Sequence, residues 1–404
     1  MFKIMSVNAG SSTLKFKLFE MPSQKVLTSG IAERIGQPTG CFKIKDLNGE
    51  THSMELPIEN HSKAVDLLLK GLIEHHIIKD LHEIAGIGHR VVQGGKYFSD
   101  SHIVDAETEA RIEELIPLAP LHNAAHLVGI RAFKEALPNC PNVVVFDTAF
   151  HQTMALSEKL YPIPYEDSVN YDIYKYGAHG TSHKYLSQKA INTYLKGKKH
   201  TNIITMHIGS GASLCAIKDG KCVDTSMGLT PLAGIMMSTR CGDVDPSIMT
   251  YYMKKSGKTA EEIYDIYNKK SGLLGVSGIS PDTRDIEKAI LVDHNERAEL
   301  ACQMYTSRIA KYVGQYFVEL GHVDMLVFSA GVYENSPYFR KRLVEYLAEP
   351  LGLELDEEAN NKAYGGKEVV ISTPKSKIPM VVIPTDEELM ICLDTVRIAN
   401  IKDE

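Results

Sequence analysis

The stretch that decides the fold is Ile4-Met5-Ser6-Val7-Asn8-Ala9-Gly10-Ser11-Ser12-Thr13-Leu14-Lys15-Phe16-Lys17-Leu18-Phe19. Its apolar start predicts a buried strand, and Leu14–Phe19 alternates apolar and polar residues, which is typical of a strand with one buried face. The turn between these strands, Asn8–Thr13, is rich in glycine and serine. Such a turn suits phosphate oxygens, because its backbone N–H dipoles converge and glycine lets the backbone approach a ligand closely.

The same pattern occurs a second time, about half a chain later. Ile203–Met206 predicts a buried strand, His207–Ser213 (His-Ile-Gly-Ser-Gly-Ala-Ser) a turn, and Leu214–Ile217 a second strand. Neither turn is a Walker A loop, because Gly-x-x-x-x-Gly-Lys-Ser/Thr does not occur in the sequence. A single hairpin of this kind is usually a plain structural turn, and that alternative stays open for the pair. Two copies nevertheless predict a duplicated domain with a ligand cleft between the halves.

The rest of the chain alternates short β-rich runs with amphipathic helices. Val143–Phe146, Met325–Phe328 and Met380–Ile383 predict further buried strands, each bounded by polar residues, glycine or proline. This alternation predicts an α/β protein whose sheets are covered by helices. Because 404 residues exceed what one hydrophobic core usually organises, we expect two domains.

Composition narrows the class of protein. Apolar residues make up 44% of the chain and the net charge is −7, so no basic surface for nucleic acid is expected. No apolar run approaches the roughly 20 residues that cross a bilayer, and the first strand leaves no room for a secretory signal. The seven cysteines are scattered without a Cys-x-x-Cys pair, which favours reduced thiols and no zinc site. These features predict a cytoplasmic protein without a membrane or nucleic-acid partner.

The turn at residues 8–13, with Leu14 and Lys15 after it, resembles the opening motif of the acetate kinase family, which belongs with actin, sugar kinases and chaperone ATPases. Further motifs follow in the family's order and extend the resemblance over nearly the whole chain. They are Gly88–Val92, Ala119–Asn123, Phe146–Met154, His179–His183, Asp224–Leu232, Thr239–Arg240, Ser271–Gly278 and Ile383–Glu388. The resemblance implies two duplicated actin-like (ribonuclease H-like) domains, with mixed sheets flanked by helices and an inter-domain cleft. The N-terminal domain would span residues 1–150 plus 384–404, and the nucleotide-binding domain residues 151–383.

The implied reaction is reversible phosphoryl transfer from ATP to acetate, giving ADP and acetyl phosphate, with Mg²⁺ or alternatively Mn²⁺ as the cofactor. Acetate is already ionised at neutral pH, so this chemistry needs no strong base. The difficulty is that an anion must approach a polyanion, which calls for in-line positioning and charge neutralisation. We therefore expect Arg90 and Arg240, which match family positions, to bind substrate and to stabilise the phosphoryl group in transfer.

The resemblance also implies the other residues of the acyl-transfer site. His179 matches a family histidine that donates to the phosphoryl group during transfer. The family assigns catalysis to Asp147, sometimes as a proton acceptor, and we favour a role in orienting Arg90 or a Mg²⁺-bound water. The implied substrate-binding residues are Arg90, Val92, Leu121, His122, Ala178 and Pro231.

The implied metal and nucleotide contacts involve both glycine-rich turns. Asn8 and Glu387 match the family's Mg²⁺ positions, and a few oxygen ligands that share the ion with phosphates and water are what Mg²⁺ prefers. Two later segments are implied to contact the nucleoside. The implied nucleotide-binding residues are Ser12, Lys15, His207, Gly209, Ser210, Gly211, Asp282, Thr283, Arg284, Gly331, Val332, Tyr333, Glu334 and Asn335.

Several motif positions depart from the family pattern without removing a charged residue. They are Gln93, His126, Ala178, Ser210, Cys241 and Tyr333. Ala178 stands in place of a phenylalanine, so we expect an enlarged acyl pocket that accepts acids longer than acetate. Tyr333 stands in place of a glycine, so we expect its ring either to stack on the adenine or to displace it.

Three functions therefore stay open. The first is an acetate kinase, and the second is a propionate or butyrate kinase, or a pyrophosphate-linked variant, of the same family. The third is a non-catalytic nucleotide-binding paralogue, which the retained charged residues disfavour. The expected partners are ATP or ADP, a short-chain carboxylate or its acyl phosphate, and a second copy of the chain in a homodimer.

Overall fold

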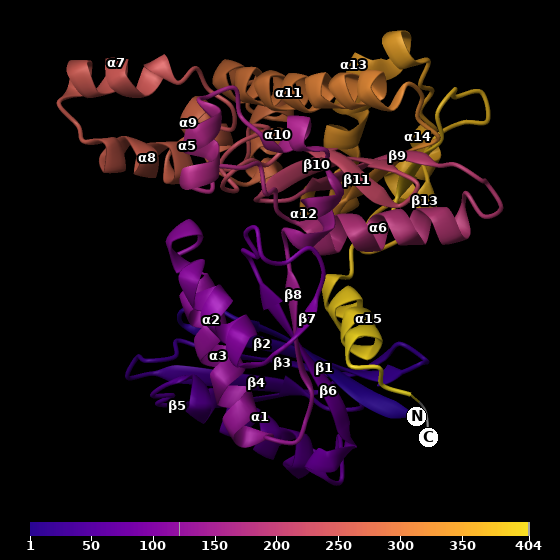
Figure 1. Cartoon of the computed structure of the whole chain (residues 1–404). Coiled ribbons are helices and arrows are strands. Elements are labelled where there is room, and N and C mark those ends of the chain that lie inside the picture. Colours follow the sequence, from indigo (N-terminus) through magenta and orange to yellow (C-terminus); the bar gives the residue numbers. More distant parts are fainter. Residues whose placement is uncertain (121, 403–404) are drawn as a thin grey trace. The chain divides into compact units, whose positions relative to one another are not determined.

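The computed structural model describes residues 1–120 and 122–402, so the predicted site residue Leu121 lies outside the described residues. The chain forms two compact units (Figure 1). Unit 1 comprises Met1–Phe150 and the segment from Asp386 onward, and unit 2 comprises His151–Thr385. The chain therefore leaves unit 1 once and returns to it once.

Unit 1 is built on an eight-stranded mixed sheet with the strand order β5-β4-β3-β2-β1-β6-β8-β7. Strands β1, β6 and β8 are parallel to one another, and the other pairings are antiparallel. The strands are β1 Phe2–Ala9, β2 Thr13–Met21, β3 Lys25–Glu33, β4 Gly40–Lys45, β5 Thr51–Leu56, β6 Ile84–Val91, β7 His102–Ile103 and β8 Asn142–Phe146.

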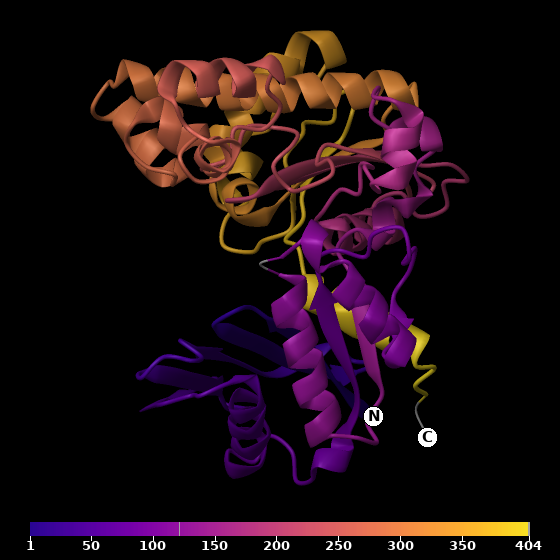
Figure 2. The same ribbon diagram turned by 60° about the vertical axis from the view of Figure 1, so that its left-hand side comes forward.

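Helices cover both faces of this sheet. The helices α1 (His61–Glu74) and α3 (Asn123–Ala136) pack on one face, α2 (Ala106–Glu114) packs against α3, and α15 (Glu387–Ile398) covers β1, β6 and β8 on the other face (Figure 2). The contact with α15 is close because β6 carries glycine there. A Cβ atom placed on Gly88 would lie 2.4 Å from Ile391 Cγ2.

Unit 2 is built on a six-stranded mixed sheet with the strand order β11-β10-β9-β12-β14-β13. Strands β9, β12 and β14 are parallel, and the remaining pairs are antiparallel. The strands are β9 Asn202–Ile208, β10 Ala212–Lys218, β11 Lys221–Thr225, β12 Met325–Ser329, β13 Val369–Val370 and β14 Met380–Val382. The helices are α4 Leu156–Lys159, α5 Tyr165–Asn170, α6 Gly180–Thr193, α7 Ser247–Ser256, α8 Ala260–Lys269, α9 Gly272–Ser277, α10 Thr283–Leu291, α11 Glu296–Leu320, α12 Ala330–Asn335, α13 Pro337–Leu351 and α14 Glu357–Lys362.

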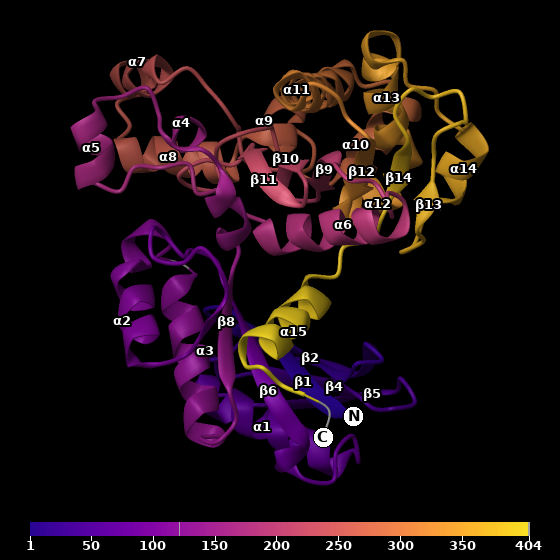
Figure 3. The ribbon, with the colours of Figure 1, turned by 45° about the vertical axis from the view of Figure 1, so that its right-hand side comes forward.

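The two faces of the unit 2 sheet differ in chemistry because strand residues alternate in direction. On β9, Ile204, Met206 and Ile208 point into the apolar core beside α11. The intervening residues, Thr205 and His207, bond to side chains of α6, which lies on the other face (Figure 3). The polar face therefore carries the candidate site.

The predicted fold class is confirmed, because both sheets are mixed and flanked by helices. The predicted duplication is visible in the topology. Strand order β3-β2-β1-β6-β8 in unit 1 repeats as β11-β10-β9-β12-β14 in unit 2, with the same parallel and antiparallel pairings. Among the described residues, no helix is long and apolar enough to cross a membrane.

Candidate active site

A chain of hydrogen bonds joins histidines on the polar face of the unit 2 sheet. Ser213 on β10 shares one hydrogen bond with His179 Nδ1 (2.9 Å) and another with His183 Nε2 (2.8 Å). The second ring nitrogen of His183 lies 2.7 Å from Thr205 Oγ1. Burial lowers the pKa of His183 well below its ordinary value, so this ring is neutral. Since Ser213 has a single proton, at least one of the two imidazoles must donate to it.

His207 lies against His179. The two rings stack with centroids 4.1 Å apart, and His207 Nδ1 is 2.8 Å from Ser182 Oγ. His179 adopts a φ of +58° at the start of α6, in the left-handed region that non-glycine residues rarely occupy. Backbone strain of this kind clusters at functional positions. The predicted residues His179 and His207 are therefore brought face to face.

The glycine-rich turn between β9 and β10 lies against both His179 and Arg240. A Cβ atom placed on Gly211 would lie 3.4 Å from Arg240 Nη1 and 3.6 Å from the His179 ring. The Gly209 N–H closes the turn by donating to the Gly211 carbonyl at 3.1 Å, and the carbonyl of Ser210 accepts from Ser238. The glycine-rich turn therefore lies beside both the imidazole of His179 and the guanidinium of Arg240. This arrangement suits a phosphate-like anion.

Arg240 carries its charge without a carboxylate beside it. Its Nη1 donates to the carbonyl of Pro231 at 3.2 Å, and among the described residues no Asp or Glu pairs with it. Burial lowers the pKa of this guanidinium from its ordinary value. Donors of Arg240 are therefore left for an anionic ligand.

The segment Gly331–Asn335, implied to contact adenine, starts beside the same turn. A Cβ atom placed on Gly209 would lie 3.8 Å from the Gly331 nitrogen. Glu334 Oε1 accepts from the N–H groups of Ala330 (2.7 Å) and Thr385 (3.0 Å). Asn335 Nδ2 donates to the Gly331 carbonyl at 2.9 Å. Glu334 and Asn335 therefore shape this backbone, which leaves main-chain atoms and small side chains for a ligand.

The position of the Tyr333 side chain contradicts one expectation. Its side chain is 1% exposed in the core of unit 2, with its ring 5.1 Å from that of Phe328. The buried Arg340 donates to the Tyr333 carbonyl and so fixes the end of α12. The expectation that this ring stacks on adenine or displaces it is wrong, because the ring points away from the surface of the unit. Val332, next to it, is also buried in this core.

The segment Asp282–Arg284 begins α10. Asp282 caps this helix by accepting from the Arg284 N–H at 2.9 Å, and it also binds the Arg284 guanidinium. The Arg284 side chain is 87% exposed, whereas Thr283 is buried. Ser336, at the end of α12, donates to Glu287 of α10 at 3.1 Å. The two implied nucleoside segments therefore lie next to each other in unit 2.

In unit 1, Arg90 and Asp147 form a fork-like ion pair at the ends of β6 and β8. Arg90 Nη2 and Nε donate to Asp147 at 2.7 and 3.1 Å. The carboxylate of Asp147 holds the pKa of Arg90 above its ordinary value. Asp147 is almost fully buried, and part of the Arg90 side chain stays exposed. Asp147 therefore fixes the direction of a guanidinium that a ligand can still reach.

A pocket of about 370 Å³ in unit 1 is lined by the implied metal ligands and by five cationic side chains, two of which are predicted site residues. Asn8, Lys15, Arg90 and Glu387 all line it. Burial raises the pKa of Glu387 to about 7, with Arg90 opposing this shift. Among the described residues, none forms a hydrogen bond or ion pair with the Glu387 carboxylate. An amide oxygen and a carboxylate without a protein partner suit a hard divalent cation.

The remaining predicted residues include Ser12, Val92, His122 and Ala178. Ser12 lies in the first turn, where its carbonyl accepts from the Ile35 N–H at 2.9 Å. Val92 is buried just after β6, and His122 lies at the start of α3. The methyl group of Ala178 is 3% exposed and belongs to the core of unit 2. The structure therefore gives no support to an acyl pocket enlarged by Ala178.

Comparison with known proteins identifies the family of this chain. The family model described as the acetokinase family matches residues 3–393. The chain belongs to the acetokinase family. Acetate kinase of Bacillus velezensis is 52% identical over 400 residues, which cover 99% of this chain and 100% of that protein. Acetate kinase of Macrococcus caseolyticus is 51% identical over 402 residues and the full length of both proteins.

Two solved structures, of an acetate kinase and a propionate kinase, share the fold over nearly the whole chain. Acetate kinase of Porphyromonas gingivalis superposes with a TM-score of 0.94 at 46% identity, covering 99% of this chain and 100% of that one. A propionate kinase of Francisella tularensis gives a TM-score of 0.90 at 39% identity, covering 98% and 100%. The predicted family is therefore confirmed.

Sequence reasoning missed the residues that orient the histidines. Ser213 and Ser182 hold His179 and His207, whereas the sequence pattern places Ser213 only in a turn. One signal was present in the sequence. Alternation along β9 and β10 puts Thr205, His207 and Ser213 on one strand face, opposite an apolar face, which marks a polar cluster.

Proposed function

We propose that this protein is an acetate kinase, which transfers a phosphoryl group reversibly between ATP and acetate. Relatives that share about half of its residues over their full length bear that name. The observation that carries the proposal is the meeting of Arg240, His179 and the Gly209–Gly211 turn at one point of unit 2. These groups supply the positive charge and donors that a phosphoryl group in transfer requires.

In this proposal, unit 2 holds the nucleotide. The backbone of the Gly209–Gly211 turn would cradle phosphates, and the neighbouring Gly331 would let the nucleoside lie close to the main chain. His179 would donate through Nε2, with its Nδ1 accepting the Ser213 proton and His183 Nε2 donating to Ser213. The Tyr333 ring is packed inward and does not occupy ligand space, which favours ATP over pyrophosphate as the phosphoryl donor.

Unit 1 supplies the groups for the acyl substrate and the metal. Arg90 would bind the acetate carboxylate with the donors that remain exposed beside Asp147. Because Asp147 is engaged with Arg90 through several contacts, we favour its orienting role over that of a proton acceptor. Asn8 and Glu387 would hold Mg²⁺, or alternatively Mn²⁺, which neutralises phosphate charge when bound.

For the acyl substrate, we favour acetate over longer acids. Ala178 replaces a larger family residue, but its methyl group lies in the core of unit 2. Replacement by phenylalanine should therefore cost about 1–3 kcal/mol of stability through overpacking and leave the ratio of acetate to propionate rates unchanged. Initial rates with acetate, propionate and butyrate, before and after Ala178→Phe, test this. Equal or faster turnover of propionate would instead indicate a propionate or butyrate kinase.

The activity itself is tested by trapping acetyl phosphate with hydroxylamine. Wild-type protein with acetate, ATP and Mg²⁺ should give acetyl hydroxamate, and pyrophosphate in place of ATP should give little. Omission of the metal should stop the reaction. Product formation from pyrophosphate at a similar rate would point to the pyrophosphate-linked variant, and no product from either donor would favour the non-catalytic paralogue.

We also propose a cytoplasmic homodimer. The scattered free cysteines fit a reducing compartment, and twofold dimers are the commonest assemblies of soluble enzymes. Sedimentation equilibrium should give twice the chain mass of 44.8 kDa. A single species of the chain mass at micromolar concentration would contradict the dimer.

A further inference from the structure

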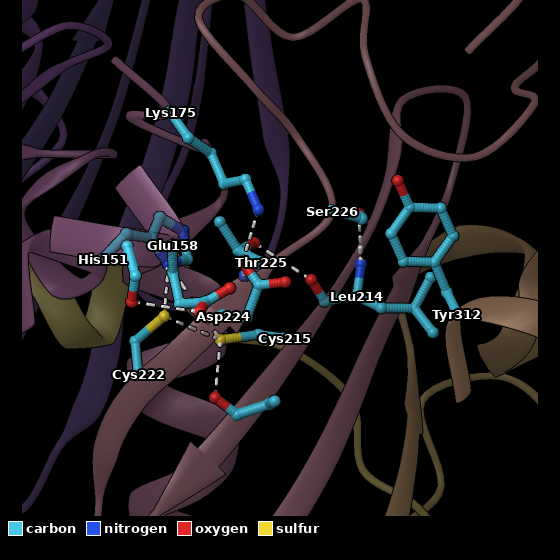
Figure 4. Close-up of polar contacts among 12 residues, drawn as sticks. His151, Glu158, Lys175, Leu214, Cys215, Cys222, Asp224, Thr225, Ser226 and Tyr312 are labelled. Carbon is cyan, nitrogen blue, oxygen red and sulfur yellow. Dashed lines mark hydrogen bonds and ion pairs between the residues drawn. The ribbon is translucent and has the colours of Figure 1, made fainter. Parts of the chain in front are cut away.

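A cluster of three metal-ligating side chains lies in unit 2 outside the residues assigned to catalysis. His151, Cys215 and Cys222 are at most 1% exposed, and Figure 4 shows their side chains converging. His151 Nδ1 is 3.3 Å from Cys222 Sγ and 4.0 Å from Cys215 Sγ, and the two sulfur atoms are 3.4 Å apart. The described cysteines are all free thiols.

The orientation of His151 is fixed by a neighbour that can only accept. Its Nε2 lies 3.0 Å from the carbonyl oxygen of Ala178, so Nε2 carries the hydrogen and donates it. In the neutral ring, Nδ1 then presents its lone pair to the two sulfur atoms. Histidine ligands of metal ions are held in just this way, with one ring nitrogen on the metal and the other donating to a carbonyl.

The separations of the three ligand atoms are close to those around a small tetrahedral ion. With Zn–S near 2.3 Å and Zn–N near 2.0–2.1 Å, tetrahedral geometry puts ligand atoms about 3.5–3.8 Å apart. Of the observed separations, 3.3 and 3.4 Å lie slightly below this range and 4.0 Å lies slightly above it. Two thiolates and one neutral imidazole also balance the charge of a divalent ion, which makes a buried complex electrically neutral.

We propose that His151, Cys215 and Cys222 form a binding site for a thiophilic divalent cation, with Zn²⁺ as the ion that fits best. Binding would release two protons from the cluster and leave the His151 Nε2–H donating to the Ala178 carbonyl. The sequence predicts no zinc site, because its cysteines are scattered without a Cys-x-x-Cys pair. Cys215 and Cys222 are seven residues apart, and His151 lies on a distant segment. Pairing of β10 with β11 and packing of the His151 segment beneath them bring the ligands together.

Two other uses of these side chains are less well supported. As free thiols, Cys215 can donate to Cys222 and Cys222 to His151, which would be a purely structural chain. As a disulfide, the sulfur atoms would have to approach to about 2.05 Å, and an oxidant would have to reach thiols that are fully buried. The metal requires neither movement of that size nor a co-reactant.

The position of the site determines how it must be loaded. Cys222 lies on β11, the edge strand of the sheet, and Thr153 Oγ1 donates to its carbonyl at 2.7 Å, which covers this edge. A fully buried site exchanges slowly with solution, so the ion is best supplied while the chain folds.

The test is the metal content of protein produced in zinc-supplemented cells and dialysed against a weak chelator. We expect about one Zn²⁺ per chain for the wild type and a loss of at least tenfold for Cys215→Ser and Cys222→Ser. Cys302→Ser is the matched control, because Cys302 is equally buried in unit 2 but lies outside the cluster, and it should retain the ion. Wild-type protein with no more zinc than the cluster variants would overturn the proposal, as would equal loss in Cys302→Ser.

A second measurement does not depend on the folding of any variant. Wild-type protein refolded with Co²⁺ should show the intense near-ultraviolet band of thiolate-to-cobalt charge transfer, and Zn²⁺ should abolish it. A refolded protein without that band, or with a Cys215–Cys222 disulfide by mass spectrometry, would refute the site. The result is independent of the proposed acetate kinase activity, which the hydroxamate assay reports separately.

Discussion

Arg90 and Arg240 carry the same charge in opposite surroundings. Arg90 is paired with the buried carboxylate of Asp147, whereas Arg240 contacts the carbonyl of Pro231 and has no carboxylate partner among the described residues. Removal of the two side chains should therefore have different consequences for the stability of the protein.

Arg240→Ala should lower kcat/KM by about two orders of magnitude or more, because loss of one donor to developing phosphoryl charge costs about 3–4 kcal/mol. The melting temperature should hardly change, since no buried charge is left unpaired. Arg240→Lys should restore only part of the activity, because an ammonium lacks the planar fork. The hydroxamate assay and a thermal scan of the three proteins measure both effects, and near-wild-type turnover of Arg240→Ala would remove this residue from the mechanism.

Arg90→Ala should, in contrast, destabilise the protein by about 3–5 kcal/mol, because it leaves the buried Asp147 carboxylate without its partner. Addition of Asp147→Asn should restore much of the stability but none of the activity. Urea denaturation of the single and double variants gives the free energies of unfolding. Equal stability of Arg90→Ala and wild type would show that the pair contributes nothing to folding.

His126 should make folding sensitive to acid. It is 3% exposed, and burial, with a smaller effect of Arg90, lowers its pKa from 6.5 to about 4. The folded state therefore binds fewer protons than the unfolded state between these values, so stability is complete above pH 6.5 and falls as the pH drops toward 4. His126→Asn should remove about 2 kcal/mol of the stability change between pH 7 and pH 5.

The control for His126 is His82→Asn, because His82 is an exposed histidine of the same unit. Urea denaturation at both pH values should give the same pH dependence for this control and the wild type. If His126→Asn also kept the wild-type dependence, then His126 would not be the group that titrates.

At the scale of elements, the turn at residues 177–179 positions the candidate site in unit 2. Gly177 has a φ of +74°, and His179 one of +58°, so the chain reverses sharply before α6 begins. The ring of His151 packs beneath this turn and donates to Ala178. A Cβ atom on Gly177 would lie 2.6 Å from Thr225 Cγ2 and 2.7 Å from His151 Cδ2.

Gly177→Ala should therefore destabilise the protein by about 2–4 kcal/mol, adding steric overlap in a packed site to the cost of left-handed backbone. The remaining folded enzyme should have a lower kcat, because His179 is displaced. Gly197→Ala isolates the backbone cost, since Gly197 also has positive φ (+88°), but among the described residues no atom lies within 4 Å of the added Cβ. Equal losses from the two variants would mean that packing around Gly177 is unimportant.

Local sequence patterns predict the strands and turns, but they do not predict contacts between residues that are far apart in the chain. Both glycine-rich turns, and the strands on either side of them, follow from apolar runs and glycine placement in a few consecutive residues. The Ser213 bridge depends on a residue of α6 and one of β10, about thirty positions apart, so no local pattern contains it. Tyr333 was misplaced because a motif position does not say which face of a short helix is buried.

At the scale of the whole molecule, unit 1 is assembled from both ends of the chain. Helix α15 packs on β1, β6 and β8, and Ile391 is 2% exposed in an apolar cluster with Val143 and Val145. The resemblance implies the same connection, because it assigns residues 384–404 to the first domain. Unit 1 is therefore incomplete without residues 386–402.

Gly88→Ala should loosen α15. The added methyl would lie 2.3 Å from Thr395 Oγ1 and 2.4 Å from Ile391 Cγ2, so the helix must shift at a cost of about 1–3 kcal/mol. Limited proteolysis should then cut within residues 386–402 before any other segment. The methyl group of Gly314→Ala in α11 meets no atom within 4 Å in the part of the chain that the structure describes, and this variant should slightly stabilise the protein. Unchanged proteolysis of Gly88→Ala would show that the contact with α15 tolerates the methyl group.

This arrangement has a consequence during synthesis on the ribosome. Strands β1, β6 and β8 emerge before all of unit 2, and α15 emerges after it. At a translation rate of about 5–20 residues per second, synthesis of unit 2 takes roughly 10–50 s. During this time the face of the unit 1 sheet that α15 later covers stays exposed. Ribosome-bound chains arrested within unit 2 should therefore be cut by protease in residues 1–150 and should recruit chaperones, and both effects should vanish once α15 has left the ribosome.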